Sequence, residues 1–329
     1  MAKQQNSEKI TIANMVSVVG VVLLLVFTYI GYSYMSGGEI GFDILVSAGI
    51  TGFTVFLLWF LIKAKSAENN LVKWKIAEFT VLAVYVIFSL STAVFGGIMH
   101  FFVVNGNKDA IKNYAVSDLD KIEQLFNDYD TFESNALAVT ATGLRNATAP
   151  RQVWHDDLRT FMNENHIAHD IESANNFVNL QREDLIGFEY ESMYEEFQHK
   201  KSEIINAVDT WSAITIPSKA NLIGKLAKAA EERLTELSQN AKLPVITQDA
   251  SIRKYVIGDY QKETFAIAGG IENLEFVEAL KTAEGFSVAA LLIVLLIHTL
   301  VLFNYIAAFR THVIKPGPDG LEEDGGRVL

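Results

Sequence analysis

The chain has 329 residues, of which 50% are apolar, 27 are basic and 39 are acidic, giving a net charge of −12. It contains no cysteine, which excludes disulfides, thiolate metal ligands and thiol catalysis. Residues 105–284 alone carry 18 basic and 30 acidic side chains, so this segment holds the whole negative excess and nucleic acid is excluded as a partner.

Four long stretches without a charged residue predict four membrane-spanning helices. These stretches lie between Lys9 and Glu39, Asp43 and Lys63, Glu78 and Lys108, and Glu284 and Arg310. Roughly 20 apolar residues cross the hydrocarbon core of a bilayer at 1.5 Å per residue. We therefore expect spans at about residues 13–35, 44–62, 76–104 and 285–309, in contact with lipid.

The distribution of basic residues predicts the orientation of the spans. The Lys63–Lys75 loop carries four lysines and one acid, whereas Glu39 and Asp43 flank the first turn without a basic residue. By the positive-inside rule, both termini and the Lys63–Lys75 loop are cytoplasmic, and residues 105–284 form an extracytoplasmic domain. A large exported domain without cysteine favours the periplasmic side of a bacterial inner membrane.

The extracytoplasmic segment predicts a mostly helical bundle. Apolar residues recur at three- and four-residue steps from Ile111 to Val139, which predicts one long amphipathic helix with Asp118 among the acids on its wet side. Further helices are expected at Gln152–Asn163, at Ala174–Val208 with Leu180 and Phe188 inward, and from Pro217 to before Pro244, with Leu222, Leu226 and Ala229 buried.

The end of this domain leaves one alternative open. Val245–Gln248 and Tyr255–Tyr260 fit either two short strands or a helix interrupted by Gly258. From Glu272 we expect a helix that runs without a break into the fourth span, as the third span runs into the long helix. The fold class is therefore an all-α polytopic membrane protein with a helical extracytoplasmic bundle, ending in a cytoplasmic tail at 310–329.

One dense group of imidazoles and carboxylates comprises His155, His166, His169 and Asp170. His166 and His169 would share one face of a helix, and the neighbouring carboxylates could complete a metal site. A solvated loop between helices is the favoured interpretation, because no His-Glu-x-x-His pattern is present. Neither a metal nor a cofactor is predicted.

His298 lies near the middle of the fourth span, where an ionisable residue is typical of a proton relay. No charged residue lies within the core of any span, so packing through a hydrogen bond is favoured over proton handling. The hydroxyl residues available on neighbouring spans are Ser89, Thr92, Thr51 and Thr54. His100, close to the outer interface, is expected to be a wetted boundary residue.

Small residues predict close contact between helices. The pairs are Gly49 and Gly52, Ser17 and Gly20, and Gly96 and Gly97, and they would pack the four spans together or join this chain to copies of itself. No phosphate-binding loop, dinucleotide fingerprint, nucleophile elbow or zincin motif is present, so no catalysis is predicted.

The plan of the whole chain resembles a known family. Three clustered spans, the basic loop Lys63-Ala-Lys-Ser-Ala-Glu-Asn-Asn-Leu-Val-Lys-Trp-Lys75, a helical extracytoplasmic domain and a terminal span are similar to TssN. TssN is the inner-membrane subunit of variant type VI secretion systems that lack the usual membrane complex. The resemblance implies a structural, non-enzymatic subunit of a trans-envelope assembly, and it carries over no functional residue.

The extracytoplasmic domain is also similar to the helical ligand-binding bundles of chemoreceptors and sensor kinases. The tail after the fourth span is about 20 residues long and has no room for their signalling part. The alternative function is therefore a ligand or stress sensor, which would signal through the third and fourth spans to a separate cytoplasmic partner at the Lys63–Lys75 loop.

The topology can be tested with single cysteines, because the chain has none of its own. In intact cells we expect a membrane-impermeant thiol reagent to label a Ser173→Cys variant and to leave a Ser66→Cys variant unlabelled. Labelling of both positions after the cells are opened is the control. Reaction at position 66 in intact cells, or its absence at position 173, would show that the orientation is wrong.

Overall fold

A computed structural model describes residues 2–66, 71–212 and 214–308. The chain divides into two compact units, which we call the apolar unit (Met1–Gly106 with Ala283–Leu329) and the polar unit (Asn107–Thr282). The predicted tail at 310–329 lies outside the described residues. Each unit has its own core and is described by itself.

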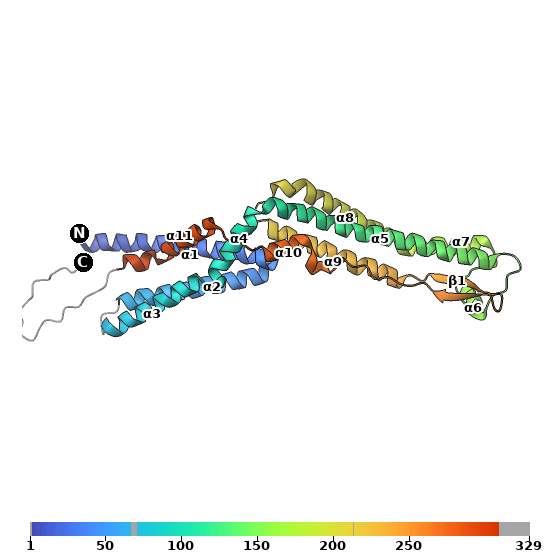
Figure 1. Ribbon diagram of the computed structural model, residues 1–329, viewed down its shortest axis with the longest axis horizontal. Helices are drawn as coiled ribbons and strands as arrows, with labels where there is room; N and C mark the ends of the chain where they lie inside the picture. Colours follow the sequence, from blue (N-terminus) through green and yellow to red (C-terminus); the bar gives the residue numbers. More distant parts are fainter. Residues whose placement is uncertain (1, 67–70, 213, 309–329) are drawn as a thin grey trace, which may run out of the picture. The chain divides into compact units, whose positions relative to one another are not determined.

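The apolar unit consists of helices throughout its regular structure (Figure 1). Its elements are α1 (Ala2–Ser36), α2 (Ile40–Ser66), α3 (Leu71–Ser89), the π-helical η1 (Thr92–Gly96), α4 (Gly97–Gly106) and α11 (Val288–Ala307). Four stretches are long and apolar enough to cross a membrane, namely Ile12–Ser36, Ile40–Ser66, Lys73–Gly106 and Val288–Ala307. The four predicted spans are thus present as apolar helical stretches.

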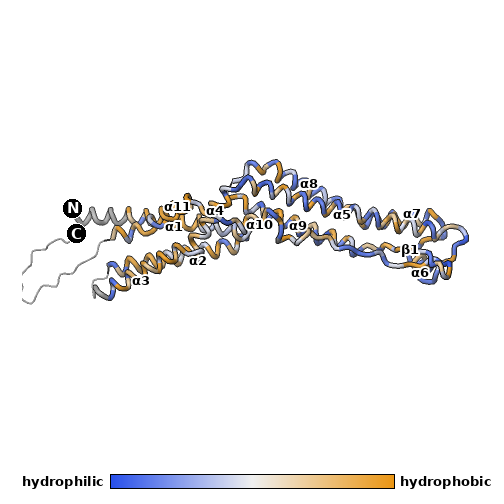
Figure 2. The backbone as a smooth tube through the Cα atoms, in the orientation of Figure 1, coloured by the Kyte–Doolittle hydropathy of each residue, from blue (hydrophilic) through white to orange (hydrophobic). Residues whose placement is uncertain are grey.

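The helices of the apolar unit consist largely of hydrophobic residues (Figure 2). Leu45 and Ile87 are each 72% exposed, and they are two of many large apolar side chains that point away from the unit's core. A surface of this kind is stable in hydrocarbon and unfavourable in water. The apolar unit therefore has the composition of a membrane domain both inside and outside.

Two glycines let helices of the apolar unit approach closely. A Cβ at Gly20 would lie 2.5 Å from the amide nitrogen of Val301, and a Cβ at Gly31 would meet the carbonyl of Gly97. The predicted packing role of Gly20 is confirmed. Gly49 and Gly52 have no atom within 4 Å of an added Cβ in the described part of the chain, so their role in self-association stays a prediction.

The polar unit is built mainly of helices around one long helix (Figure 1). Its elements are α5 (Lys108–Thr148), α6 (Asp156–Glu164), α7 (Ile171–Ile186), α8 (Phe188–Ala207), η2 (Val208–Thr210), α9 (Ile216–Asn240), β1 (Pro244–Asp249), β2 (Lys254–Asp259), η3 (Ile271–Asn273) and α10 (Glu275–Thr282). The helix α5 has 41 residues, a length of roughly 60 Å, and α7, α8, α9, α10 and β1 all pack against it.

Most of the predicted apolar stripe of α5 is confirmed as the core of the polar unit, whereas Tyr114 and Val139, which follow the same spacing, are 40% and 43% exposed. The buried residues recur along one face and include Ile111, Leu119, Ile122, Phe126, Tyr129, Phe132, Ala136 and Leu144. Aromatic rings from α8 and from the segment after β2 close over the middle of this stripe, with the ring centroids of Phe126 and Phe197 5.1 Å apart and those of Tyr129 and Phe265 5.2 Å apart. Local periodicity was sufficient to predict this face.

The predicted helix at Ala174–Val208 is wrong as a single element. It is two helices, α7 and α8, separated by Gly187 in an extended conformation. A Cβ at Gly187 would collide with the carbonyl of Glu183, so this sharp break needs glycine. Phe188, the first residue after the break, was expected inside and is 86% exposed, and Leu180 of α7, also expected inside, is 59% exposed.

Two other helical predictions needed a shift in position. The helix α6 begins at Asp156 and not at Gln152, because Val153 and His155 bond the backbone of Tyr255 at 3.1 and 2.9 Å. In α9 the predicted Ala229 is exposed, and Leu222, Leu226 and Leu237 are half-buried, whereas Leu234, also predicted inside, is fully buried. The buried face of α9 comprises Ile216, Ala220, Ile223, Ala227, Ala230 and Leu234.

The open alternative after Pro244 is resolved in favour of strands. β1 and β2 form an antiparallel hairpin in which Val245 pairs with Gly258 and Ile246 with Ile257. An isolated two-stranded hairpin is marginally stable, so this one depends on its packing against α5. The contact is tight, because Gly143 of α5 leaves just enough space for Ile246.

The expected continuous helix from Glu272 into the fourth span is also wrong. α10 ends at Thr282 and α11 begins at Val288, and the residues between them are not helical. Gly285 has a φ of 156°, and the Ser287 side chain caps α11 by accepting from the Ala290 amide at 3.3 Å. At the N-terminal boundary of the polar unit, α4 and α5 are separated in the chain by Asn107 alone.

Two glycine-to-alanine changes in the polar unit should have opposite effects on the free energy of unfolding. A Cβ at Gly143 would lie 2.7 Å from the Ile246 Cβ and 2.9 Å from its carbonyl oxygen. We expect Gly143→Ala to lower the free energy of unfolding by about 1–3 kcal/mol. Gly224→Ala in α9, where an added Cβ meets no described atom within 4 Å, should raise it by about 0.5–1 kcal/mol.

Denaturant unfolding of the full chain in detergent, followed by circular dichroism, checks both variants. An unchanged stability of the Gly143→Ala variant would contradict the close packing of the hairpin on α5.

Candidate functional site

The strongest candidate site of the apolar unit is a polar centre around His298. The imidazole is buried on α11, and its Nδ1 lies 2.7 Å from the Tyr85 hydroxyl and 3.3 Å from the Ser89 hydroxyl. The Tyr85 ring stands edge-on to the imidazole, with the ring centroids 5.5 Å apart. Three polar side chains from α3 and α11 therefore meet within an apolar core.

Ser89 is confirmed as a partner of His298, and Tyr85 is the residue that the sequence prediction missed. Tyr85 and Ser89 are four residues apart and share one face of α3. This spacing could have identified Tyr85 as a second partner of His298. The predicted threonines do not serve this role: Thr54 bonds the Ile50 carbonyl at 2.9 Å, and Thr92 is exposed. The Thr51 hydroxyl has no hydrogen-bond partner among the described residues.

The polar centre adjoins a break in the third apolar stretch. α3 ends at Ser89, and η1 carries the chain on as a π-helix from Thr92 to Gly96. Side chains supply bonds at the break: Ser91 donates to the Phe88 carbonyl at 2.6 Å, and Tyr32 of α1 donates to the Ala93 carbonyl at 2.9 Å. Such local partners make a broken helix tolerable in an apolar medium, and π-helical turns are frequent at functional sites.

The chemistry of the centre favours hydrogen bonding over proton relay. The Nε2 atom of His298 has no hydrogen-bond partner among the described residues, and Tyr85 is the titratable group bonded to its other nitrogen. The acidic residues of the described apolar unit lie near helix ends, with Asp43 in the first turn of α2 and Glu78 in the second turn of α3. No carboxylate is bonded to the imidazole within the described chain.

His100 differs from its predicted environment. It lies on α4 and is only 9% exposed, so the expectation of a wetted boundary residue is wrong. α1 packs against α4 and contributes to this burial. The prediction was wrong because the sequence alone does not show which face of α4 meets a neighbouring helix.

Polar contacts tie together the end of α2, the first part of α3 and the end of α11. Lys65 donates to the Tyr305 carbonyl at 2.6 Å, and the Tyr305 hydroxyl donates to the buried Glu78 carboxylate at 2.6 Å. Lys65, from the basic loop predicted to meet a cytoplasmic partner, thus bonds a carbonyl at the end of α11. The partner itself stays a prediction.

The clustered histidines and carboxylates of the polar unit do not share one face of a helix. Residues 165–170 form a loop, in which His166 has a left-handed φ of 55° and His169 stacks on the Trp154 ring with centroids 4.6 Å apart. Asp170 caps α7 by accepting from the Ser173 amide at 2.8 Å, which lowers its pKa. His155 precedes α6, with its Nδ1 3.6 Å from Asp157.

A loop is present at residues 165–170, as the favoured interpretation expected. No three histidine, aspartate or glutamate side chains converge as metal ligands within the described ranges. His155, His166, His169 and Asp170 instead have local structural contacts.

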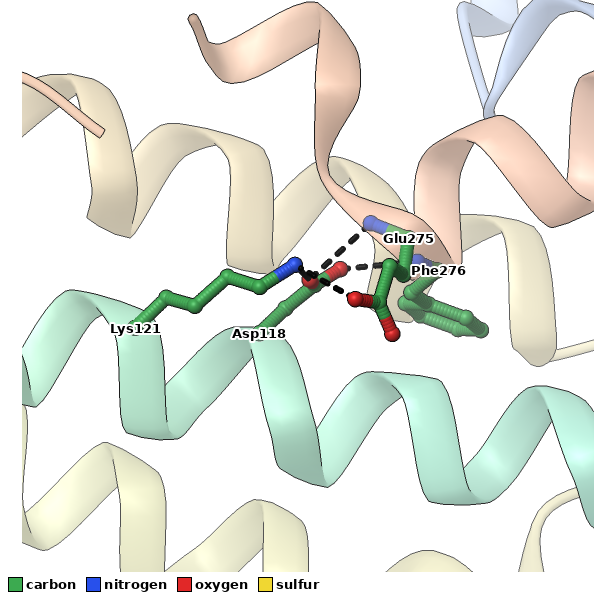
Figure 3. Close-up of polar contacts among 4 residues, drawn as sticks. All are labelled: Asp118, Lys121, Glu275 and Phe276. Carbon is green, nitrogen blue, oxygen red and sulfur yellow. Dashed lines mark hydrogen bonds and ion pairs between the residues drawn. The ribbon is translucent and has the colours of Figure 1, made fainter. Parts of the chain in front are cut away.

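A second polar site lies inside the polar unit, where Asp118 of α5 caps α10 (Figure 3). Its two carboxylate oxygens accept from the amides of Glu275 and Phe276 at 2.9 and 2.7 Å. Lys121 bonds both Asp118 and the Glu275 carboxylate, at 3.1 and 3.0 Å. Asp118 has no exposed surface, so its predicted place on the wet side of α5 is wrong.

Burial raises the pKa of Asp118 above its ordinary value, although the bonds from Phe276, Lys121 and Glu275 oppose the increase. Burial lowers the pKa of Lys121, but its bonds to Glu275 and Asp118 outweigh burial and leave that pKa raised. The ion pair and the two amide bonds therefore compensate only part of the cost of placing a carboxylate in the core.

Comparison with known proteins finds no match to a family model, to a curated protein or to a solved structure. The resemblance to TssN thus rests on the plan of the chain, and function has to be argued from its residues.

The raised pKa of Asp118 predicts how an Asp118→Ala change depends on pH. The variant leaves two amides of α10 without their cap and should lower the free energy of unfolding by about 1–3 kcal/mol. Because the folded pKa lies above the ordinary value of 3.8, the stability linked to this group is fully present below 3.8 and is lost as pH rises through the folded pKa.

The deficit of the Asp118→Ala variant should therefore be larger in acid than at neutral pH. Denaturant unfolding at several pH values measures it, with the exposed first-turn change Asp109→Ala as the matched control. A deficit that grows as the pH rises would contradict this assignment.

Proposed function

We propose that the chain is a non-enzymatic integral-membrane anchor and scaffold in an envelope-spanning protein complex. In this proposal the apolar unit spans the bacterial inner membrane, the polar unit lies in the periplasm, and both termini are cytoplasmic. Four apolar helical stretches and a separately packed polar unit support this division of roles.

The observation that carries the proposal is the construction of α5. Its 41 residues are supported along their length by other elements of the polar unit, and its buried stripe extends from Ile111 to Leu144. Lys201 of α8 adds ion pairs to Asp120 and Glu123 at 2.6 and 2.7 Å. A long helix supported in this way is stiff, and stiff helices hold their two ends at a fixed separation.

The far end of α5 carries a surface suited to a protein partner, which we call the tip (149–155, 165–169 and 250–253). The three loops adjoin one another through the His155–Tyr255 backbone bond and the Trp154–His169 stack. In these loops Val153 and Ile252 are exposed.

The charge of the tip differs from that of the rest of the polar unit. The three loops contain two arginines and three histidines and no acid of their own, although Asp157, 3.6 Å from the His155 Nδ1, and Asp249 directly adjoin them. Arg151, His166 and Arg253, all in the tip, are the described non-glycine residues with positive φ. Strained backbone of this kind concentrates at binding sites, and exposed aliphatic groups between arginines suit an acidic protein surface.

The resemblance to TssN supports the same class of function. An inner-membrane subunit with three clustered spans, an extracytoplasmic helical domain and a terminal span would anchor a secretion complex of the type VI class. Self-association through Gly49 and Gly52 of α2, which lack a described neighbour, would fit such a complex.

A sensor is the second candidate, favoured by the way α10 is held. Asp118 fixes the start of α10, and five residues beyond its end lead into α11. A ligand that altered this cap would act on the chain segment that enters the fourth span. The signal would reach a separate cytoplasmic partner at the Lys63–Lys75 loop.

Affinity purification from mild detergent distinguishes the two functions. We expect the wild-type chain to co-purify with other envelope proteins, and a Val153→Asp, Ile252→Asp double variant to lose at least one of them. Ile214→Asp, at another exposed apolar residue of the polar unit, is the matched control and should retain them all. Thermal unfolding of each variant verifies that it is folded.

A wild-type chain that purifies alone and binds a small ligand would favour the sensor. Retention of every partner by the double variant would remove the tip from the scaffold proposal.

A further inference from the structure

The apolar unit contains one fully buried acid without a partner. Asp43, in the first turn of α2, has no exposed surface, and neither of its carboxylate oxygens has a hydrogen-bond partner among the described residues. This differs from the sequence-based expectation that Asp43 merely marks the charged edge of a span. A buried polar group without a partner is rare in proteins and needs a physical explanation.

Two hydroxyl groups lie close to Asp43. Ser33 and Ser36, in the last turn of α1, face its side chain closely enough to act on the carboxyl group, but neither carboxylate oxygen has a partner with hydrogen-bond geometry among the described residues. The Ser36 hydroxyl donates to the Ser33 carbonyl at 3.3 Å, and the Ser47 hydroxyl donates to the Asp43 carbonyl at 2.6 Å. The hydroxyl hydrogens of Ser36 and Ser47 are therefore used by backbone oxygens, and the Ser33 hydroxyl is the one neighbouring donor named above that these bonds do not engage.

The charges near Asp43 make its ionised form still less favourable. Glu39, one turn earlier, adds a second negative charge. No lysine, arginine or histidine pairs with Asp43 in the described chain, and the titratable group beside Ser33 on α1 is the buried phenol of Tyr34. An ionised carboxylate without a cation or a hydrogen-bond donor is very costly in an apolar medium, and such a group neutralises instead.

We propose that Asp43 is a proton-binding site, whose carboxyl group is neutral in the folded protein at neutral pH. The bound proton turns one carboxylate oxygen into a donor, and the hydroxyl oxygens of Ser33 and Ser36, which face the carboxyl group, can accept from it. The proton is the ligand, and its release would leave an uncompensated charge between the ends of α1 and α2.

Release of the proton has a structural consequence for the connection between α1 and α2. The two helices are joined by Gly37 and Gly38, whose φ values of 74° and 90° make a tight turn. An ionised Asp43 needs water, which can reach it only if the neighbouring ends of α1 and α2 separate. The site is therefore a latch that is closed with the proton bound and open without it, independently of the scaffold proposal.

Infrared spectroscopy of the full-length protein in detergent tests the protonation directly. At neutral pH the wild type should show a carbonyl stretching band of a protonated carboxylic acid that disappears in an Asp43→Asn variant. The matched control is Glu39→Gln, which removes the exposed neighbouring acid and should leave the band in place.

Two infrared results would overturn the proposal. Identical spectra of wild type and the Asp43→Asn variant in this region would show that Asp43 is ionised. A band that is absent in sodium chloride and appears when choline replaces sodium would show that a metal cation occupies the site.

Thiol labelling tests the latch, since the native chain has no cysteine. A Ser47→Cys variant probes the buried side, and a Met35→Cys variant at an exposed residue corrects for the pH dependence of the thiol reaction. The labelling rate at position 47 relative to position 35 should rise at least fivefold from pH 6 to pH 9, and Asp43→Asn should abolish the rise. An unchanged ratio in the wild-type background would disprove the latch, while the infrared result decides the proton site on its own.

Discussion

Inside the apolar unit, a buried polar group has to find its partner within the unit, because the surrounding apolar side chains offer none. This constraint accounts for most of the side-chain hydrogen bonds there. Thr28 donates to the Leu24 carbonyl one turn back, and Tyr32 reaches across to the π-helical break of the third span. These bonds stabilise the break. Buried polar groups without such a partner are candidates for a functional role.

The polar unit meets the same constraint at the ends of its elements. The Tyr129 hydroxyl donates to the Leu185 carbonyl, where α7 stops before Gly187. The irregular segment before α10 is held by side chains of α9, since Phe265 donates its amide to the Thr235 hydroxyl and Ile267 donates to the Glu231 carboxylate. Buried helix ends and loops are thus satisfied by side chains from a neighbouring helix, and α5 and α9 supply them.

The sequence predicted those features that depend on neighbours within a few turns. The stripe of α5 and the partnership of Ser89 with His298 followed from periodicity and from the rarity of an imidazole in a span. Asp118 was wrongly placed in water. The amides that donate to its carboxylate belong to residues 157 and 158 positions further along the chain, and a local pattern does not show such partners. Phe188 was placed inside because one helical period was continued through Gly187. Long-range pairing and local backbone breaks account for these errors.

The two buried aspartates show how the same group can serve structure or function. Each lies beside the start of a helix, where the helix dipole favours a negative charge. Asp118 has two amides and a lysine, so its charge is largely compensated and its role is that of a cap. Asp43 has none of these partners. Burial alone therefore does not distinguish a structural carboxylate from a titrating one. The difference lies in whether the structure supplies donors, because a carboxylate without donors is stable only when it takes up a proton or a cation.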